Sequence, residues 1–214
     1  LLLQALRSWL DDEVSCAVME LEDGATYHLR RCMAQIVEDS SVLDDEWCKL
    51  HPDEARAYME KSKSARDVLK GCIDVLPADT PATPAALLEW LAKRAATCRV
   101  VAIDPITLLS RGRNPWLDDE QFLFSAKRII EQTGTSLFLV THPRRLMAGQ
   151  SKFTLDDLSG GICYSRFSQT VLQLTAHAPK DEVVETLHGT IAQSTNRVVT
   201  VYKARNGSGC EFNQ

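Results

Sequence analysis

Residues 100–104, Val-Val-Ala-Ile-Asp, constrain the fold of this chain more than any other segment. Four apolar residues without a turn former, three of them β-branched, predict a strand that is buried on both faces of a parallel sheet. Asp104 ends this run. Because open α/β sheets bind ligands at the carboxyl ends of their strands, we expect the Asp104 carboxylate to lie at a site for a magnesium ion or a polar ligand.

Length and charge exclude several classes of protein. The chain has 214 residues and a net charge of −5, so we expect one domain over 1–214 and only local contact with a polynucleotide. Its seven cysteines include no C-x-x-C pair, which argues against a zinc site or a disulfide framework. No run of 18 apolar residues occurs, so we expect no membrane span and a reducing, aqueous compartment.

The remaining apolar runs predict an alternation of strands and helices. Strands are expected at 14–19, 72–76, 135–140, 170–174 and 197–203. Helices are expected at 25–38, 85–96 and 117–132, short surface helices at 39–70, a loop at 146–167 and a polar excursion at 177–195. This order indicates an α/β fold with a doubly wound, mostly parallel sheet, in which later strands can pair antiparallel.

The predicted strand ends carry polar residues in a characteristic order. Glu22 follows the first strand, Asp104 follows Val-Val-Ala-Ile, and His142 lies in Phe-Leu-Val-Thr-His-Pro-Arg-Arg. A Ser-Gly-Gly loop at 159–161 precedes Thr-Val-Leu-Gln-Leu, and Lys203-Ala-Arg205-Asn-Gly follows the last strand. In order and spacing these segments resemble the RecA-like ATPase core of hexameric replicative helicases of the DnaB, Twinkle and RepA type. The resemblance implies a RecA-like P-loop NTPase core.

The resemblance also implies roles for these residues, with ATP and Mg²⁺ as cofactors. Glu22 matches the catalytic glutamate that polarises the attacking water, Asp104 the Mg²⁺ aspartate and His142 the sensor of the γ-phosphate. Lys203 and Arg205 match the basic pair that such rings insert into the nucleotide site of the neighbouring subunit. Glu20, two residues before Glu22, stays open as an alternative catalytic base.

The implied function is that of an ATP-dependent DNA helicase motor that translocates on single-stranded DNA in a hexameric ring. Arg113 and Arg166 are the candidate DNA contacts, and primase or other replication proteins are further candidate partners. A cytoplasmic or nucleoid-associated location follows from these roles. The alternative is a RecA-fold protein that does not translocate: a recombination mediator, a regulatory ATPase or a catalytically silent assembly subunit.

The sequence departs from the family pattern in one respect. No G-x-x-x-x-G-K-[ST] segment occurs, so the loop that would cradle the phosphates is missing. We therefore expect the chain to be a fragment that lacks the N-terminal P-loop strand and the closing C-terminal strand, and that is inactive alone. A degenerate ATPase that never had the loop stays open as an alternative.

Overall fold

The structure of the protein is a computed structural model that describes residues 2–76, 80–142, 154–158, 162–186, 189–205 and 211–213. Its contacts divide the chain into two compact units, Leu1–Arg144 and Arg145–Gln214, and each is described here by itself. The single domain over 1–214 stays a prediction.

The first unit is built on a four-stranded parallel sheet. The strands are β1 (Cys16–Glu20), β2 (Ile73–Val75), β3 (Val100–Asp104) and β4 (Ser136–Leu139), in the order β2-β1-β3-β4. The first four residues of β3 are buried, which confirms the strand predicted at 100–104. All five residues of β1 are buried as well. β1 and β3 therefore form the centre of the sheet.

Helices surround this sheet, among them helices close to the ranges 25–38, 85–96 and 117–132 that the apolar spacing predicts. They are α1 (Leu2–Asp11), α2 (Ala25–Val37), η1 (Ser40–Leu43), α3 (Asp45–Leu50), α4 (Pro52–Lys61), α5 (Lys63–Cys72), α6 (Pro84–Ala95), η2 (Ile106–Leu108) and α7 (Pro115–Thr133). Local signals set several ends. Thr83 Oγ1 accepts a hydrogen bond from Ala86 N at 3.2 Å and Pro84 occupies the first turn of α6. Gly134, with φ of 71°, ends α7 in the left-handed conformation.

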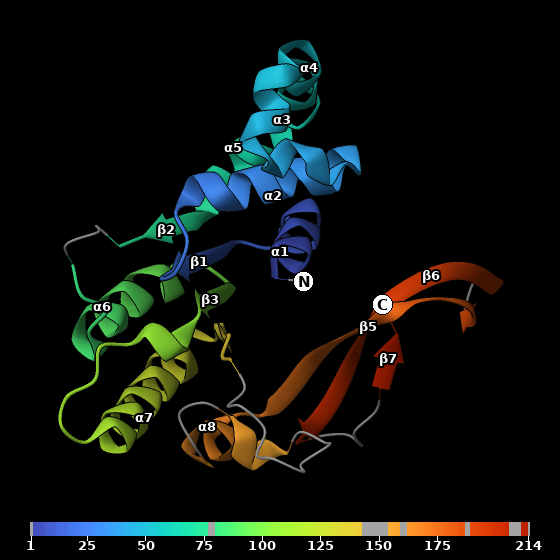
Figure 1. The fold of residues 1–214 in the computed structure, drawn as a ribbon. Coiled ribbons are helices and arrows are strands. Elements are labelled where there is room, and N and C mark those ends of the chain that lie inside the picture. Colours follow the sequence, from blue (N-terminus) through green and yellow to red (C-terminus); the bar gives the residue numbers. More distant parts are fainter. Residues whose placement is uncertain are drawn as a thin grey trace. The chain divides into compact units, whose positions relative to one another are not determined.

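The two faces of the sheet are covered by different helices, as Figure 1 shows. Leu6 of α1, Cys32 of α2 and Leu69 of α5 pack with Val18 and Ala102 in one buried cluster. Helix α6 contacts β3 and packs against α7. Because side chains alternate between the faces of a strand, β1 and β3 contribute to both layers. The first unit is thus an α/β sheet flanked by helices, as the sequence predicts.

β4 differs from the sequence prediction in its burial. The sequence indicates a buried strand at 135–140, but the residues of β4 alternate between exposed and half-buried. The side chain of Phe138 is 39% exposed, and the centre of its ring lies 5.1 Å from the centre of the Trp9 ring. β4 is an edge strand with β3 as its neighbour in the described sheet, so its apolar residues are covered from one side.

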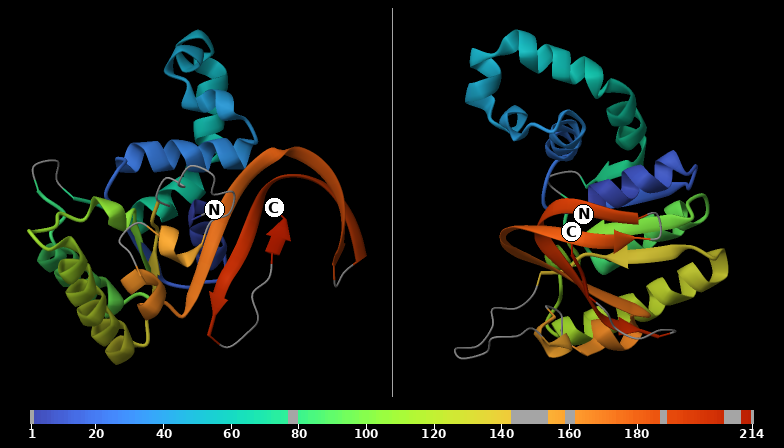
Figure 2. Two further views of the ribbon diagram at one scale, coloured as in Figure 1. Left: turned by 60° about the horizontal axis from the view of Figure 1, so that its bottom comes forward. Right: turned by 90° about the vertical axis from the view of Figure 1, so that its right-hand side faces the viewer.

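The second unit contains an antiparallel sheet, a pairing that the sequence analysis allowed for the later strands. It comprises η3 (Leu155–Asp157), α8 (Ile162–Phe167), β5 (Thr170–Thr186), β6 (Gly189–Ala204) and β7 (Glu211–Asn213), in the strand order β5-β6-β7. β5 and β6 form a long curved hairpin (Figure 2). The expected polar excursion at 177–195 is therefore wrong, as is the expected loop over all of 146–167, because α8 lies within it. Hairpin pairing uses backbone groups and needs no apolar run.

None of the helices in the described ranges is long and apolar enough to cross a membrane.

Candidate active site at the carboxyl edge of the sheet

Two carboxylates lie side by side where β1 and β3 end. Glu20 and Asp104 are register partners in this parallel pair. The pairing extends one residue further, since Leu21 N donates a hydrogen bond to Asp104 O at 2.8 Å. Register partners point to the same face of a sheet, so both side chains share the face on which α2 packs.

A histidine from α2 approaches Glu20. Helix α2 begins at Ala25, directly after the turn that follows β1, and this places His28 over the strand end. His28 Nε2 lies 3.0 Å from Glu20 Oε2, and the two residues are 8% and 2% exposed. The sequence analysis missed this pair. Glu20 and His28 are eight positions apart, and only the packing of α2 on β1 brings them together.

The charge on Asp104 is disfavoured by its surroundings. Burial raises its pKa first, and the neighbouring Glu20 raises it further. His28 and His142 lower the pKa and Glu22 raises it, with the result that it lies at about 6. A cation placed among these carboxylates would relieve the cost of the charge. The residues therefore fit a divalent ion electrostatically.

A divalent ion at this edge would need ligands beyond the side chains that the structure describes. No group of three His, Cys, Asp or Glu side chains in the described ranges is arranged to hold a metal. Mg²⁺ is usually bound by one or two carboxylates, with water and substrate phosphates as its other ligands. Asp104 with its neighbouring acids suits that mode better than a site built from protein ligands alone.

Glu22 and His142 meet at the same edge. β4 is continued beyond Leu139 by two hydrogen bonds, from Val140 N to Ile103 O at 3.0 Å and from Ile106 N to Val140 O at 2.8 Å. His142 Nε2 lies 3.6 Å from Glu22 Oε2, and the side chains are 61% and 57% exposed. Three strand ends thus bring together Glu22, Asp104 and His142, and the first and last of these are open to solvent. Their catalytic roles stay predictions.

The predicted basic residues near the C-terminus lie in the second unit. Lys203 Nζ donates a hydrogen bond to Ser165 O of α8 at 2.5 Å, which ties β6 to this helix. Arg205 is exposed, and its backbone N–H donates to Gln169 O at 3.0 Å. Arg166 is exposed, with its guanidinium 5.4 Å from the centre of the Phe167 ring. The Ser-Gly-Gly segment at 159–161 lies outside the described residues.

The basic turn before α7 contains residues with different surroundings. Arg111 Nε donates to Asp119 Oδ1 at 2.8 Å, and Asp119 is buried, so this arginine fastens the turn to α7. Arg113 is exposed. Trp116, three residues further on, is 64% exposed. An exposed indole three residues after an exposed arginine offers both kinds of group with which proteins bind single-stranded nucleic acid, and Trp116 was not singled out from the sequence.

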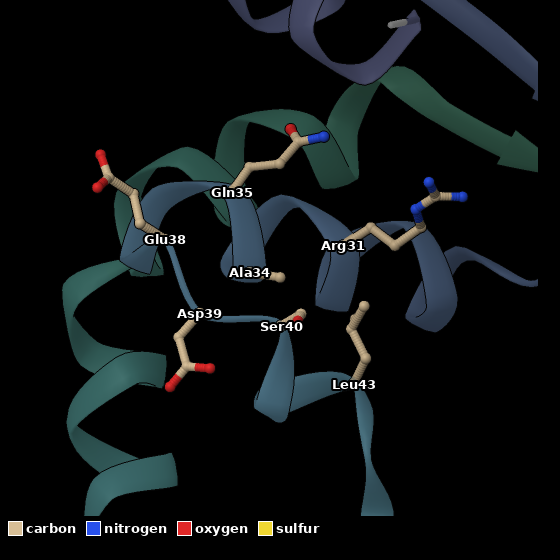
Figure 3. A pocket seen from close by; sticks show the side chains of 7 residues that line it. All are labelled: Arg31, Ala34, Gln35, Glu38, Asp39, Ser40 and Leu43. Carbon is tan, nitrogen blue, oxygen red and sulfur yellow. The ribbon is translucent and has the colours of Figure 1, made fainter. Parts of the chain in front are cut away.

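A shallow hollow lies elsewhere in the first unit (Figure 3). It is lined by side chains from the second half of α2 and from η1 with the turn before it: Arg31, Ala34, Gln35, Glu38, Asp39, Ser40 and Leu43. None of the predicted site residues lines it. The acidic edge of the sheet therefore remains the candidate site.

Comparison with known proteins supports the fold. No protein-family model matches the chain, and no curated protein matches it in sequence. Among solved structures it is similar to a DnaB-like replicative helicase whose structure was described with its interactions with primase. The TM-score is 0.68 at 13% sequence identity, over 95% of this chain. The chain spans 48% of the length of that helicase chain.

Proposed function

We propose that this chain is the motor domain of an ATP-dependent DNA helicase, which hydrolyses ATP to translocate on single-stranded DNA within a hexameric ring. One observation carries the proposal: Glu22, Asp104 and His142 come from three separate strand ends and gather at one edge of the sheet. Phosphoryl transfer depends mainly on positioning and charge stabilisation, and this edge supplies a metal-binding acid, a base and a polar group.

In this proposal Asp104 holds Mg²⁺, and Glu22 accepts the proton of the attacking water. The metal ion would neutralise charge on the phosphates of the bound nucleotide. Glu22 suits the role of base better than Glu20, because its carboxylate is open to solvent while that of Glu20 is buried against His28. His142 lies within reach of Glu22 and would respond to the terminal phosphate.

Arg205 supplies positive charge to the site of a neighbouring subunit in this proposal. It is exposed, as a residue that crosses a subunit boundary must be before assembly. Lys203 is held by the Ser165 carbonyl and would position β6 and thereby Arg205, as well as contributing charge. An arginine supplied in trans meets charge that develops in the transition state.

DNA contacts are proposed for Arg113 and Arg166. Both side chains are exposed, and the exposed Trp116, three residues after Arg113, offers an aromatic face on which a base can stack. A motor of this kind would act on replicating DNA, with primase or other replication proteins as partners. Of these partners, primase is the one with which the structurally similar helicase interacts.

The test is DNA-stimulated ATP hydrolysis and strand displacement by the protein at the full length that its gene encodes. We expect Asp104→Asn to lower the turnover of ATP about 100-fold or more, because the metal ion loses its charged ligand. Asp12→Asn, at an exposed position after α1, is the matched control and should leave turnover unchanged.

Other outcomes point to the alternative functions. DNA binding without strand displacement would indicate a mediator or a regulatory ATPase. Neither hydrolysis nor displacement would indicate a silent assembly subunit. Full turnover by Asp104→Asn at limiting Mg²⁺ would rule out the proposed metal ligand.

A further inference from the structure

Three cysteines lie at the amino ends of three neighbouring strands of the parallel sheet, opposite the acidic edge. Cys16 is the first residue of β1, Cys72 is the last residue of α5 directly before β2, and Cys98 precedes β3 by two positions. All three are free thiols. Cys16 is buried, while Cys72 is only partly buried and packs against the cluster that contains Cys16. A protected thiol thus lies beside one that solvent can reach.

The strand pairing brings the segments that carry Cys16 and Cys72 together. Val18 of β1, two residues after Cys16, is the register partner of Ile73, the residue directly after Cys72. Cys72 packs against the buried cluster that contains Cys16. Disulfides span Cα separations of about 4.4–6.8 Å, a range that includes the spacing of about 4.8 Å between neighbouring strands.

The two thiols are also chemically unequal. The hydrogen bond from Cys16 lowers the pKa of Cys72, the charge of Arg94 lowers it further, and burial and Asp74 act in the opposite direction; the pKa lies at about 7. The hydrogen bond with Cys72 and burial raise the pKa of Cys16. Cys72 is therefore the more acidic thiol of the pair. A reachable thiolate beside a second thiol is the arrangement found in redox-sensitive cysteine pairs.

We propose that Cys72 and Cys16 are a peroxide-sensitive dithiol, with Cys72 as the thiol that is oxidised first and Cys16 as the thiol that resolves it to a disulfide. The disulfide would connect the end of α5 to the start of β1. This proposal is independent of the ATPase function, because it uses none of the residues at the acidic edge.

The oxidation balances in two steps. The Cys72 thiolate attacks one oxygen of hydrogen peroxide, the O–O bond breaks, and hydroxide leaves and takes a proton to become water; Cys72 is now a sulfenic acid. Cys16 then attacks the Cys72 sulfur, the S–O bond breaks, and the departing hydroxide takes up the Cys16 proton as a second water. The thiol pair loses two electrons, and the peroxide gains them.

The experiment treats the reduced full chain with hydrogen peroxide and maps disulfide-linked peptides by mass spectrometry over time. We expect a Cys16–Cys72 link to form before Cys48 is modified, since Cys48 is a partly buried thiol outside this cluster. In Cys16→Ser the Cys72 sulfenic acid should persist and react with dimedone. Cys48→Ser is the matched control and should form the link at the wild-type rate.

The unmodified chain decides the outcome even if Cys16→Ser fails to fold. A link between Cys72 and Cys98, oxidation of Cys72 without any link, or modification of Cys48 as fast as that of Cys72 would each overturn the proposal. A second measurement is thermal unfolding. The link closes a long loop, so the oxidised chain should melt on the order of 5 °C or more above the reduced chain, and an unchanged or lower midpoint would count against native pairing.

Discussion

At the scale of single residues, the fold disfavours the ionised form of the Asp104 carboxyl group. Its pKa lies at about 6 because burial and the neighbouring Glu20 oppose ionisation. In an unfolded chain the pKa of an aspartate is about 3.9. Between these values the folded protein binds the extra proton, so stability falls as the pH rises from about 4 to about 6. A residue that lowers stability at neutral pH is typical of a functional site.

We predict that Asp104→Asn raises stability at about pH 8 and has much less effect at about pH 4. The amide removes the disfavoured charge, and the gain should be on the order of 1–2 kcal/mol after solvent screening is allowed for. The measurement is denaturant unfolding in metal-free buffer, with the exposed Asp12→Asn as control. Equal destabilisation by Asp104→Asn at both pH values would contradict the electrostatic account of this residue.

At the scale of elements, an ion pair connects β2 to α6. Asp74 follows Ile73 in β2 and accepts hydrogen bonds from Arg94 Nε at 2.6 Å and from Trp90 Nε1 at 2.8 Å. Burial raises the pKa of Asp74, but the bonds from Arg94 and Trp90 together with nearby positive charge outweigh it, so the pKa lies below its usual value. The stabilisation is therefore present above about pH 4 and is lost as the pH falls through the folded-state pKa.

Arg94→Ala should lower the free energy of unfolding by about 1–3 kcal/mol at neutral pH, because it leaves a partly buried carboxylate without its partner. The difference from wild type should shrink once Asp74 is protonated. Glu89→Ala, at an exposed position of the same helix, is the control. A loss that persists unchanged in acid would mean that packing of the arginine stem, and not the ion pair, connects these elements.

Elements with a strong local pattern could be predicted from the sequence, and those that depend on long-range pairing could not. Periodicity located β3 and α2 because one or two faces of each are apolar. The hairpin of β5 and β6 was missed beyond Thr175, where exposed polar residues such as Lys180 and Asp181 pair through the backbone with no apolar signal. The exposure of β4 was missed for a related reason. Whether a strand lies at the edge of a sheet depends on its neighbours, which its own residues do not reveal.

The residues of the candidate site also divide into those that could be predicted from the sequence and those that could not. The sequence indicated Glu22, Asp104 and His142 because each follows an apolar run, and the structure brings these strand ends to one edge. It gave no sign of the contact between Glu20 and His28, which depends on how α2 packs on β1. That contact gives Glu20 surroundings different from those of Glu22, the two acids that the sequence left as alternatives.

At the scale of the whole molecule, the residues with proposed catalytic roles are divided between the two units. The acids belong to the first unit, and Arg205 to the second. If Arg205 acts on the site of a neighbouring subunit, each site in a ring combines residues of two chains. Activity would then belong to the assembly, and an isolated subunit would turn over ATP slowly.

Mixing two inactive variants tests this arrangement. Arg205→Ala and Glu22→Gln should each be nearly inactive in the full-length protein, yet mixed rings should recover part of the wild-type turnover, because some junctions join an intact Glu22 to an intact Arg205. The measurement is phosphate release after subunit exchange, at a concentration where sizing shows a ring. Activity no greater than the sum of the separate variants would exclude the role of Arg205 in trans.

The central claim is that the acidic edge of the sheet hydrolyses ATP with Glu22 as the base. Its most direct test measures ATP binding and ATP turnover for Glu22→Gln in the full-length protein, beside Glu20→Gln and the exposed control Glu60→Gln. The account predicts that Glu22→Gln binds ATP as the wild type does while its turnover falls by about 100-fold or more, because a carboxamide has the shape of the acid but cannot accept the proton. Wild-type turnover by Glu22→Gln, with the loss seen in Glu20→Gln instead, would contradict it.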